Sequence, residues 1–556
     1  MGVTKKTQYL LLFLIIIAGF SLRAFKHQDW LLFQSDQSRD AMIIEKAEGE
    51  FGGLPLLGPQ ASSSVLKLGP VFYYFQFAAS ELFGVSPAVL AWPDLFFGVL
   101  SIAVFFFLMR KFFTAGLSLA LTSLYSVSYF LIVYDRFAWN PNSIPFFLLL
   151  LALSLINSVV GGKRYRWLFL AGLCAGVLMQ LHFVAFFLAP ALFITFLVIN
   201  FKEYSKFLMA LALLVIPLVN LPVLVYDYKN EAQNSKALLE TFRERTSESD
   251  HNLAEKFFRG FQEASFYNWA ILTGDQKTDP VRTKRKDDGS IESKCDKKCE
   301  NLIWHTRVSV LLFLGGLFLV YRKRKEKLSK QERVFLNLFS IWIILFTLII
   351  TPVAYEVSPR FFLALAPFSF FLLGLVVCFA GEKIASRKIR VAVVALIFLV
   401  CYLFNLGETI KYFKELSQSN KAPLIDRRED KTLPNGEIVT LEQMEKIAKI
   451  IKEDKSEGEE AILIVENRYA RSIFYLLKYR LGADAECYLK MSDFEPNIPD
   501  DYYYVVNTGS EDHFKDGTLD YHNVSGRKKL GTLILYKLSP KRESDEVQTN
   551  PKCRTF

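Results

Sequence analysis

Apolar residues in this chain form long runs that alternate with shorter polar segments. An apolar run of about 20 residues is long enough to cross a membrane as a helix. We therefore expect a polytopic α-helical membrane protein with about 11–13 transmembrane helices. The candidate runs are about 8–25, 70–84, 89–109, 115–134, 143–160, 167–181, 183–200, 207–226, 303–321, 334–351, 361–380 and 390–406. The run at 70–84 is the weakest, because it is short and begins at Gly69-Pro70, so it could instead re-enter the membrane.

The charges between the runs predict the orientation of the chain. By the positive-inside rule, segments rich in Lys and Arg face the cytoplasm. Lys5 and Lys6 place the N-terminus inside, and four loops are basic: 163–166, 202–206, 322–333 and 383–390. The remaining long segments then face outward: 26–69, 227–302, 352–360 and everything after 407. We expect a multi-pass protein of the plasma (inner) membrane whose C-terminal domain is exoplasmic or periplasmic.

Composition supports this class of protein. Of the 556 residues, 52% are hydrophobic and 15% aromatic, which is more apolar than an ordinary soluble domain. The net charge of +10 could indicate nucleic acid, but the basic residues lie between apolar runs, where membrane topology explains them better. We expect the lipid bilayer, and no nucleic acid, as a partner. Residues 1–25 lack an Ala-x-Ala cleavage site, which favours a retained first helix over a removed signal peptide.

The C-terminal quarter of the chain has a different pattern. Residues 440–454 have helical apolar spacing and 471–479 also predict a helix, whereas short runs rich in β-branched and aromatic residues predict strands. The predicted strands are 461–465, 502–506 and 532–536. We therefore divide the chain into a transmembrane catalytic domain at 1–407, a small soluble exoplasmic α/β domain at 408–540 and a disordered tail at 541–556. The first domain includes two outer loops, 26–69 and 227–302.

A charged cluster follows the first apolar run, in Gln34-Ser-Asp-Gln-Ser-Arg-Asp40. Helical spacing would place Asp36 and Asp40 on one face, with Arg39 beside Asp36. Such a pair can accept a proton or hold a divalent cation. Alternatively, Asp36 caps a helix that starts near Gln37.

Other polar residues near predicted outer helix ends are candidates for binding. Lys67 could bind a phosphate or extend from the membrane to the interface, and Tyr73 and Tyr74 could contact substrate or belong to an aromatic belt. Arg136 and Arg360 are fixed cations suited to phosphate. The remaining candidates are Asn140, His182 and Tyr355, of which Asn140 also fits a turn before Pro141 and His182 a structural role. Cys295 and Cys299 could form a disulfide or half of a metal site.

Several function classes are not supported. We find no P-loop, no strand-linked Gly-rich dinucleotide motif, no His-Glu-x-x-His and no Gly-x-Ser-x-Gly. Neither nucleotide-driven transport nor standard hydrolase chemistry is therefore predicted.

Three stretches carry a resemblance to a known superfamily: Ser35-Asp-Gln-Ser-Arg-Asp40, Lys67-Leu-Gly-Pro-Val-Phe-Tyr-Tyr74 and Phe83-Gly-Val-Ser86. Over residues 1–400 the chain resembles the GT-C glycosyltransferases, integral membrane enzymes that use lipid-phosphate sugar donors. It is most similar to bacterial relatives of the protein O-mannosyltransferases and of the aminoarabinose–lipid A transferase. The resemblance implies a GT-C fold, a polyprenyl-phosphate sugar donor and an exoplasmic acceptor, which could be a lipid, a glycan or a protein.

The resemblance also implies roles for single residues. Asp36 corresponds to the family's catalytic acid in the first outer loop and would act as general base in an inverting transfer, while Lys67 would contact the donor phosphate. Gln37 and Leu66 stand where relatives often have acidic residues. No cofactor is therefore certain, and a divalent metal stays an alternative.

Two rival functions remain at this point. One is a transporter or flippase of a lipid-linked or small anionic substrate, with Asp36 and Arg136 along its route. The other is a non-enzymatic assembly protein whose C-terminal domain recruits partners.

Overall fold

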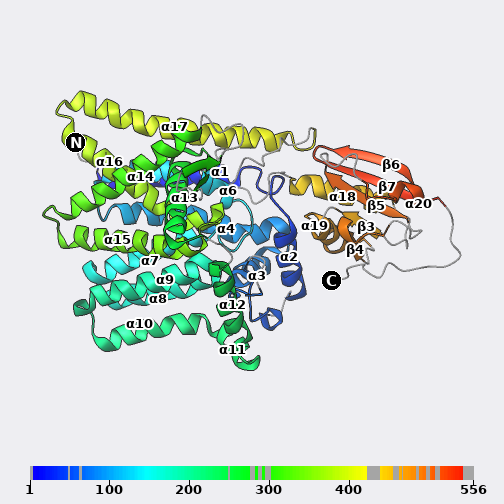
Figure 1. Ribbon diagram of the computed structural model, residues 1–556, viewed down its shortest axis with the longest axis horizontal. Coiled ribbons are helices and arrows are strands. Elements are labelled where there is room, and N and C mark those ends of the chain that lie inside the picture. The colour runs from blue at the N-terminus through cyan, green and yellow to red at the C-terminus, as the bar shows by residue number, and fades with distance from the viewer. Residues whose placement is uncertain are drawn as a thin grey trace.

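The computed structural model consists of a helical body and a smaller sheet-containing domain at one end of it (Figure 1). It describes residues 4–47, 51–61, 65–247, 251–275, 282–285, 291–294, 302–421, 439–454, 462–465, 468–483, 487–495, 501–507 and 514–541.

Every predicted apolar run is helical. The corresponding helices are α1 (Lys5–Ala24), α3 (Val71–Phe83), α4 (Pro87–Met109), α5 (Ala115–Ser126), α6 (Tyr129–Tyr134), α7 (Ile144–Val160), α8 (Arg164–Leu181), α9 (Phe183–Ile199), α10 (Lys206–Val219), α11 (Leu221–Lys229), α14 (Leu302–Arg324), α15 (Lys330–Ile350), α16 (Ala366–Lys383) and α17 (Arg387–Ser417). Two runs are each broken into two helices. The break between α10 and α11 bends the chain by 61° at Asn220, just before Pro222, which lacks the N–H that a continuous helix needs.

Additional helices lie in the predicted outer loops. They are α2 (Ser35–Ala47), α12 (Gln233–Ser247) and α13 (Leu253–Thr273). There are 3₁₀ turns at Phe51–Gly53, Thr351–Val353 and Pro359–Ala364, and another at Phe201–Glu203 beside the basic loop at 202–206. Our sequence reading assigned no helix to α12 or α13. The buried side of α13 includes charged residues such as Lys256 and Arg259, so its apolar pattern is incomplete.

Five of the described helices, α1, α4, α15, α16 and α17, are long and apolar enough to span a membrane, and the bent pair α10–α11 would be a sixth. Helices α7 and α9 are apolar but shorter. The chain is thus a multi-pass membrane protein, while the total of 11–13 crossings stays a prediction.

The C-terminal domain is built on a five-stranded sheet in the order β4-β3-β5-β7-β6. Strands β3 (Ile462–Val465), β4 (Cys487–Lys490) and β5 (Tyr502–Asn507) are parallel, and β7 (Leu533–Pro540) and β6 (His522–Leu530) complete the sheet in antiparallel order. The helical elements are α18 (Leu441–Asp454), α19 (Ala470–Tyr475), a π-helical turn at Leu476–Arg480, a 3₁₀ turn at Met491–Asp493 and α20 (Thr518–Tyr521). A separate hairpin pairs β1 (Arg282–Arg285) with β2 (Ile291–Lys294).

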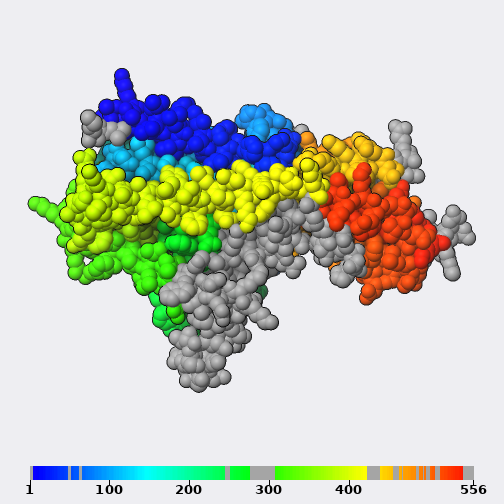
Figure 2. Space-filling model, turned by 90° about the horizontal axis from the view of Figure 1, so that it is seen from above, coloured from blue at the N-terminus to red at the C-terminus, as the bar shows by residue number. Residues whose placement is uncertain are grey.

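The predicted α/β domain is therefore confirmed, although two strands were missed. Most residues of β6 are exposed and polar, so the strand lacks an apolar face to recognise. Helix α17 runs through residue 407, where we expected the domain boundary, and ends at Ser417. Figure 2 shows it as a continuous yellow ridge along the helical body that reaches the C-terminal domain. The division at 407 itself stays a prediction.

Candidate functional site

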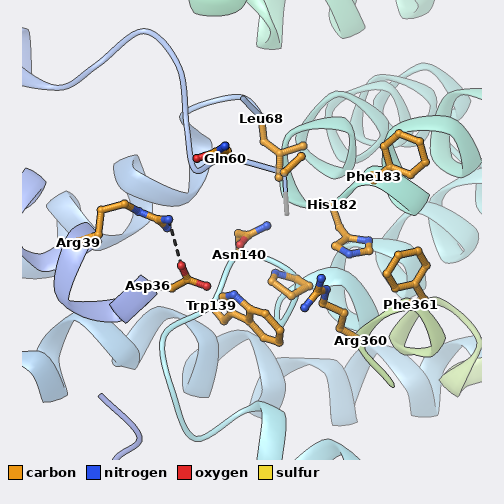
Figure 3. A pocket seen from close by; sticks show the side chains of 12 residues that line it. Asp36, Arg39, Gln60, Leu68, Trp139, Asn140, His182, Phe183, Arg360 and Phe361 are labelled. Carbon is orange, nitrogen blue, oxygen red and sulfur yellow. Dashed lines mark hydrogen bonds and ion pairs between the residues drawn. The ribbon is translucent and has the colours of Figure 1, made fainter. Parts of the chain in front are cut away.

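A cavity of about 310 Å³ is lined in part by α2, the helix that lies next to the C-terminal domain in Figure 1. It is lined by Asp36, Arg39, Gln60, Ala61, Leu68, Trp139, Asn140, Pro141, His182, Phe183, Arg360 and Phe361. In Figure 3, Asp36 and Arg39 face the cavity from one side and His182 and Arg360 from the other, with Asn140 and Trp139 between them. The structure thus brings together five of the residues chosen from the sequence, from segments far apart in the chain.

Asp36 lies in the first turn of α2, and its side chain is half exposed at 50%. The neighbouring Gln37 anchors this turn, because its Oε1 accepts from the Gln34 amide at 3.0 Å and its Nε2 donates to the Ala138 carbonyl at 3.0 Å. Gln37 therefore bonds the start of α2 and connects it to the cavity wall. The Asp36 carboxylate faces the cavity.

Arg39 connects the two acidic residues of α2. Its guanidinium donates to Asp36 Oδ1 at 3.1 Å and contacts Asp40 Oδ1 at 2.8 Å. Asp40 is buried and also accepts from the Tyr73 hydroxyl at 3.1 Å. Burial raises the pKa of Asp40 to about 6, although Arg39 opposes this shift. Asp40 and Tyr73 do not line the cavity, so their visible role is to hold Arg39.

The wall between these two sides is the loop between α6 and α7, and a carboxylate from α4 holds it in place. Asp94 Oδ2 accepts from the Trp139 amide at 2.9 Å and Asp94 Oδ1 from the Ser143 hydroxyl at 2.6 Å. Asn140 itself donates to the Leu181 carbonyl at the end of α8. Our sequence reading missed Asp94. The signal was available, because Asp94 is the single charged residue in the 87–109 segment and ionisable groups within apolar helices are functional candidates.

Arg136 lies in the same loop but does not line the cavity. It is buried, and its guanidinium donates to the Leu22 and Arg23 carbonyls at 3.2 and 2.7 Å, which caps the C-terminal end of α1. The adjacent Asp135 forms a buried ion pair with Arg23 at 2.7 Å. The position of Arg136 therefore indicates a role in holding the loop on α1 and not in binding a phosphate in the cavity.

Arg360 and His182 complete the cavity. The Arg360 guanidinium lies 4.9 Å from the centroid of the Trp139 ring, and the His182 ring contacts Phe361 edge-on at 4.8 Å. Nδ1 of His182 accepts from the Val184 amide at 3.3 Å, so the histidine also caps α9. Tyr355 lies elsewhere, stacked on His251 at a centroid distance of 4.0 Å.

A second, smaller cavity of about 160 Å³ adjoins the first, since Leu68 and Phe183 line both. Its other lining residues are mostly apolar: Leu66, Lys67, Gly69, Met179, Phe186, Asn220, Val223, Leu224, Asp227, Asn234, Ser235 and Leu238. Lys67 belongs to this second cavity and is exposed at its edge. Tyr74 lines neither cavity.

Side chains from other helices hold the Lys67 segment. Asn234 accepts from the Lys67 amide and donates to the Lys67 carbonyl, both at 3.0 Å. Gln180 accepts from the Val71 amide at 3.1 Å and packs against Gly69, where an added Cβ would lie 2.3 Å from Gln180 Cγ. A side chain at this position would therefore displace Gln180 from its bond to Val71.

The described residues contain no group of three or more His, Cys, Asp or Glu side chains placed to hold a metal ion. Asp40, the acid nearest Asp36 in the chain, already bonds Arg39 and Tyr73. The donor set therefore does not fit a metal bound by these two acids, and we derive no step through one. Cys295 and Cys299 lie outside the described residues.

The chain resembles known proteins in sequence over part of its length and in fold over most of it. Residues 67–226, which include Lys67, Asn140 and His182, match a family model described as dolichyl-phosphate-mannose-protein mannosyltransferase. No curated protein sequence matches the chain significantly.

Among solved structures, ArnT from Cupriavidus metallidurans bound to undecaprenyl phosphate matches with a TM-score of 0.52 at 11% identity, over 95% of this chain and 97% of ArnT. Its apo form matches with a TM-score of 0.51 at 10% identity and the same coverage. The archaeal oligosaccharyltransferase AglB from Archaeoglobus fulgidus matches with a TM-score of 0.47 at 13% identity. This match covers 86% of this chain and 64% of AglB. The predicted resemblance to the GT-C glycosyltransferases is confirmed, and the chain has the GT-C fold.

Proposed function

We propose that this protein is a membrane glycosyltransferase that moves a sugar from a polyprenyl-phosphate donor to an exoplasmic acceptor, with inversion at the sugar and Asp36 as general base. One observation carries the proposal: in the larger cavity the half-exposed Asp36 carboxylate lies opposite Arg360, and the smaller, mostly apolar cavity adjoins it. A base and a cation on opposite walls suit a displacement in which a proton is removed and a phosphate leaves.

In the proposed reaction, Asp36 accepts the proton of an acceptor hydroxyl as the acceptor oxygen bonds to the anomeric carbon of the sugar. The bond between that carbon and the phosphate oxygen breaks, and the polyprenyl phosphate leaves with the electron pair. Attack from the side opposite the leaving group inverts the configuration of the carbon. Arg39, held by Asp40 and Tyr73, keeps Asp36 oriented toward the cavity.

The donor would occupy both cavities. Arg360 is suited to stabilise the leaving phosphate, because its planar guanidinium can bond two phosphate oxygens while it stacks on Trp139. Lys67, at the edge of the apolar cavity, would bind the same phosphate from the other side. The first part of the lipid chain would then lie among Phe186, Leu224 and Leu238. The ArnT structure with undecaprenyl phosphate is a precedent for such a ligand on this fold.

The proposal is tested by incubating the purified protein with defined polyprenyl-phosphate sugars and candidate acceptors and determining the anomeric configuration of the product. Transfer with inverted configuration is expected. Retained configuration would contradict the single-displacement mechanism, and sugar transfer that continues undiminished in Asp36→Asn would contradict the role of Asp36.

The rival interpretation as a transporter requires ionisable side chains along a route through the helices. The buried candidates Arg23, Asp135 and Asp94 instead hydrogen-bond to one another or to the cavity loop. These bonds therefore do not support transport. Movement of lipid-linked sugar across vesicles without any transfer would support it instead.

A further inference from the structure

We propose that the C-terminal domain positions the catalytic helix: Arg471 and Tyr475 of α19 hold the two ends of α2 and thereby set the direction of Asp36. This inference rests on the proposed catalytic role of Asp36. It assigns a function to a domain that does not itself line the cavity.

The polar contacts of α2 with α19 and with the turn before it lie at both ends of α2. At the N-terminal end, Arg471 donates to the Ser35 carbonyl at 3.1 Å, and the Ser35 hydroxyl donates to the Arg468 carbonyl at 2.9 Å. At the C-terminal end, the Tyr475 hydroxyl donates to Glu45 Oε1 at 2.7 Å. Ser35 is the residue directly before Asp36, so the C-terminal domain bonds the backbone next to the proposed base.

The segment that leads into α2 is held by the same domain. The backbone amides of Leu441 and Glu442, at the start of α18, donate to the carbonyls of Leu31 and Asp29 at 2.9 and 3.1 Å. Beside them, the ring of Phe33 packs on Tyr475 with centroids 5.4 Å apart, and both side chains are buried. Such shared backbone bonding and buried packing are typical of a fixed interface between domains and not of a flexible tether.

Helix α2 depends on such support. With 13 residues it is too short to be stable on its own in water, so its orientation comes from packing. On the side of the helical body, the Gln37–Ala138 bond and the Tyr73–Asp40 bond hold it. Because a shift of about 1 Å can reduce catalysis by about 100-fold, bonds at both ends of α2 matter for the reaction.

Two tyrosines in the C-terminal domain allow a matched test. The Tyr475 hydroxyl donates to a carboxylate across the domain interface, whereas the Tyr503 hydroxyl donates to Asp454 within the domain at 2.8 Å. In the full-length protein, Tyr475→Phe should make the amides of 35–47 exchange hydrogen about tenfold faster, since one bond to a charged group is lost. Tyr503→Phe should leave them unchanged.

Activity gives the second readout. Tyr475→Phe should lower kcat about tenfold while the binding of undecaprenyl phosphate is kept, because Asp36 is displaced but the donor cavity is not. Glu45→Ala should have the same effect, and Glu45→Gln, which keeps an oxygen acceptor, should recover most of the activity. A loss of donor binding and kcat together would indicate general destabilisation and would overturn the positioning role.

The outcomes separate this inference from the proposed function. Unchanged exchange of 35–47 in Tyr475→Phe overturns the inference whatever the activity is. Faster exchange with full activity also overturns it, provided that Asp36→Asn is inactive. If Asp36→Asn is fully active, the proposed base is wrong, whereas faster exchange in Tyr475→Phe would still support the mechanical link between α19 and α2.

Discussion

The two neighbouring cavities share Leu68 and Phe183 but differ in chemistry. The larger one contains Asp36, Arg39 and Arg360, and its walls come from α2, the loop after α6 and the turn at 359–364. The smaller one is lined mainly by aliphatic and aromatic side chains, with Lys67 at its edge. A lipid-phosphate sugar has the same division, with a charged reacting centre at one end and an apolar chain at the other.

The cavities also differ in how their charged groups are held. In the larger cavity, the side chains themselves are oriented: Arg39 by Asp40, and Arg360 by its stacking on Trp139. In the smaller cavity, Asn234 bonds only the backbone of Lys67, and the Lys67 side chain is exposed at the edge of the cavity. Oriented charged side chains in one cavity and an exposed cation in the other fit the proposal that chemistry belongs to the first cavity and lipid binding to the second.

The largest expected effect is the loss of the base. Asp36→Asn keeps the shape of the side chain but cannot accept the proton, so kcat should fall by about 1,000-fold while donor binding is unchanged. Initial rates at saturating donor measure this. The control is Asp29→Asn, in the same outer segment, where the carboxylate pairs with Lys26 on the surface at 3.0 Å. An equal loss in both variants would count against a specific role.

Removing the Arg360 guanidinium from the larger cavity should have the next largest effect on activity. Arg360→Ala should lower kcat/KM about 100-fold, because the leaving phosphate loses a preorganised donor. Arg360→Lys should recover part of it, since the charge is kept but the stacking on Trp139 is lost. Steady-state kinetics measure both variants. Arg164→Ala, which affects an exposed ion pair with Glu203, serves as control.

Filling the smaller cavity should affect the lipid and not the chemistry. Leu238→Trp places a larger ring among the lining residues and should raise KM for a long-chain donor about tenfold, with little change for a short-chain donor. Leu239→Trp is a matched control, because Leu239 is 72% exposed and does not line the cavity. If both donors lose kcat equally in Leu238→Trp, the proposed separation of roles between the cavities is wrong.

The smallest expected effect is a pH dependence of stability that arises at Asp40, which holds Arg39 of the larger cavity. Burial raises the pKa of Asp40 from 3.8 to about 6, so the folded chain binds this proton more tightly than the unfolded chain does. The stabilisation is complete below about pH 4 and is lost as the pH rises through about 6. In detergent, Tm of the wild type relative to Asp40→Asn should therefore fall by a few degrees over this window. A constant difference would argue against the raised pKa.

Much of the fold could be predicted from the sequence, because it depends on local composition. Apolar runs must form helices in a membrane, since no water is available to bond their backbone groups, and every run of this kind is helical. The strands at 462–465, 502–507 and 533–540 were found for a similar reason, as buried apolar segments. Helix α13 and strand β6 were missed, because their apolar faces are interrupted by charges or absent.

The candidate site could be predicted in part. Asp36, Arg39, Asn140, His182 and Arg360 were chosen because they lie at predicted outer helix ends, and all of them line one cavity. The role of Asp94 was missed, since its bonds to Trp139 and Ser143 join residues about 50 positions apart. Hydrogen bonds over such separations leave no periodic pattern in the chain.

The sequence by itself determined which segments are helices or strands and that acidic and basic residues gather between them, because these properties follow from composition and short-range spacing. The tertiary structure alone decided which of two similar arginines faces the cavity. Arg136 caps α1 through the Leu22 and Arg23 carbonyls, whereas Arg360 stacks on Trp139 at the cavity wall. It also decided that α19 lies against α2, because contacts between residues more than 400 positions apart depend on how the whole chain packs.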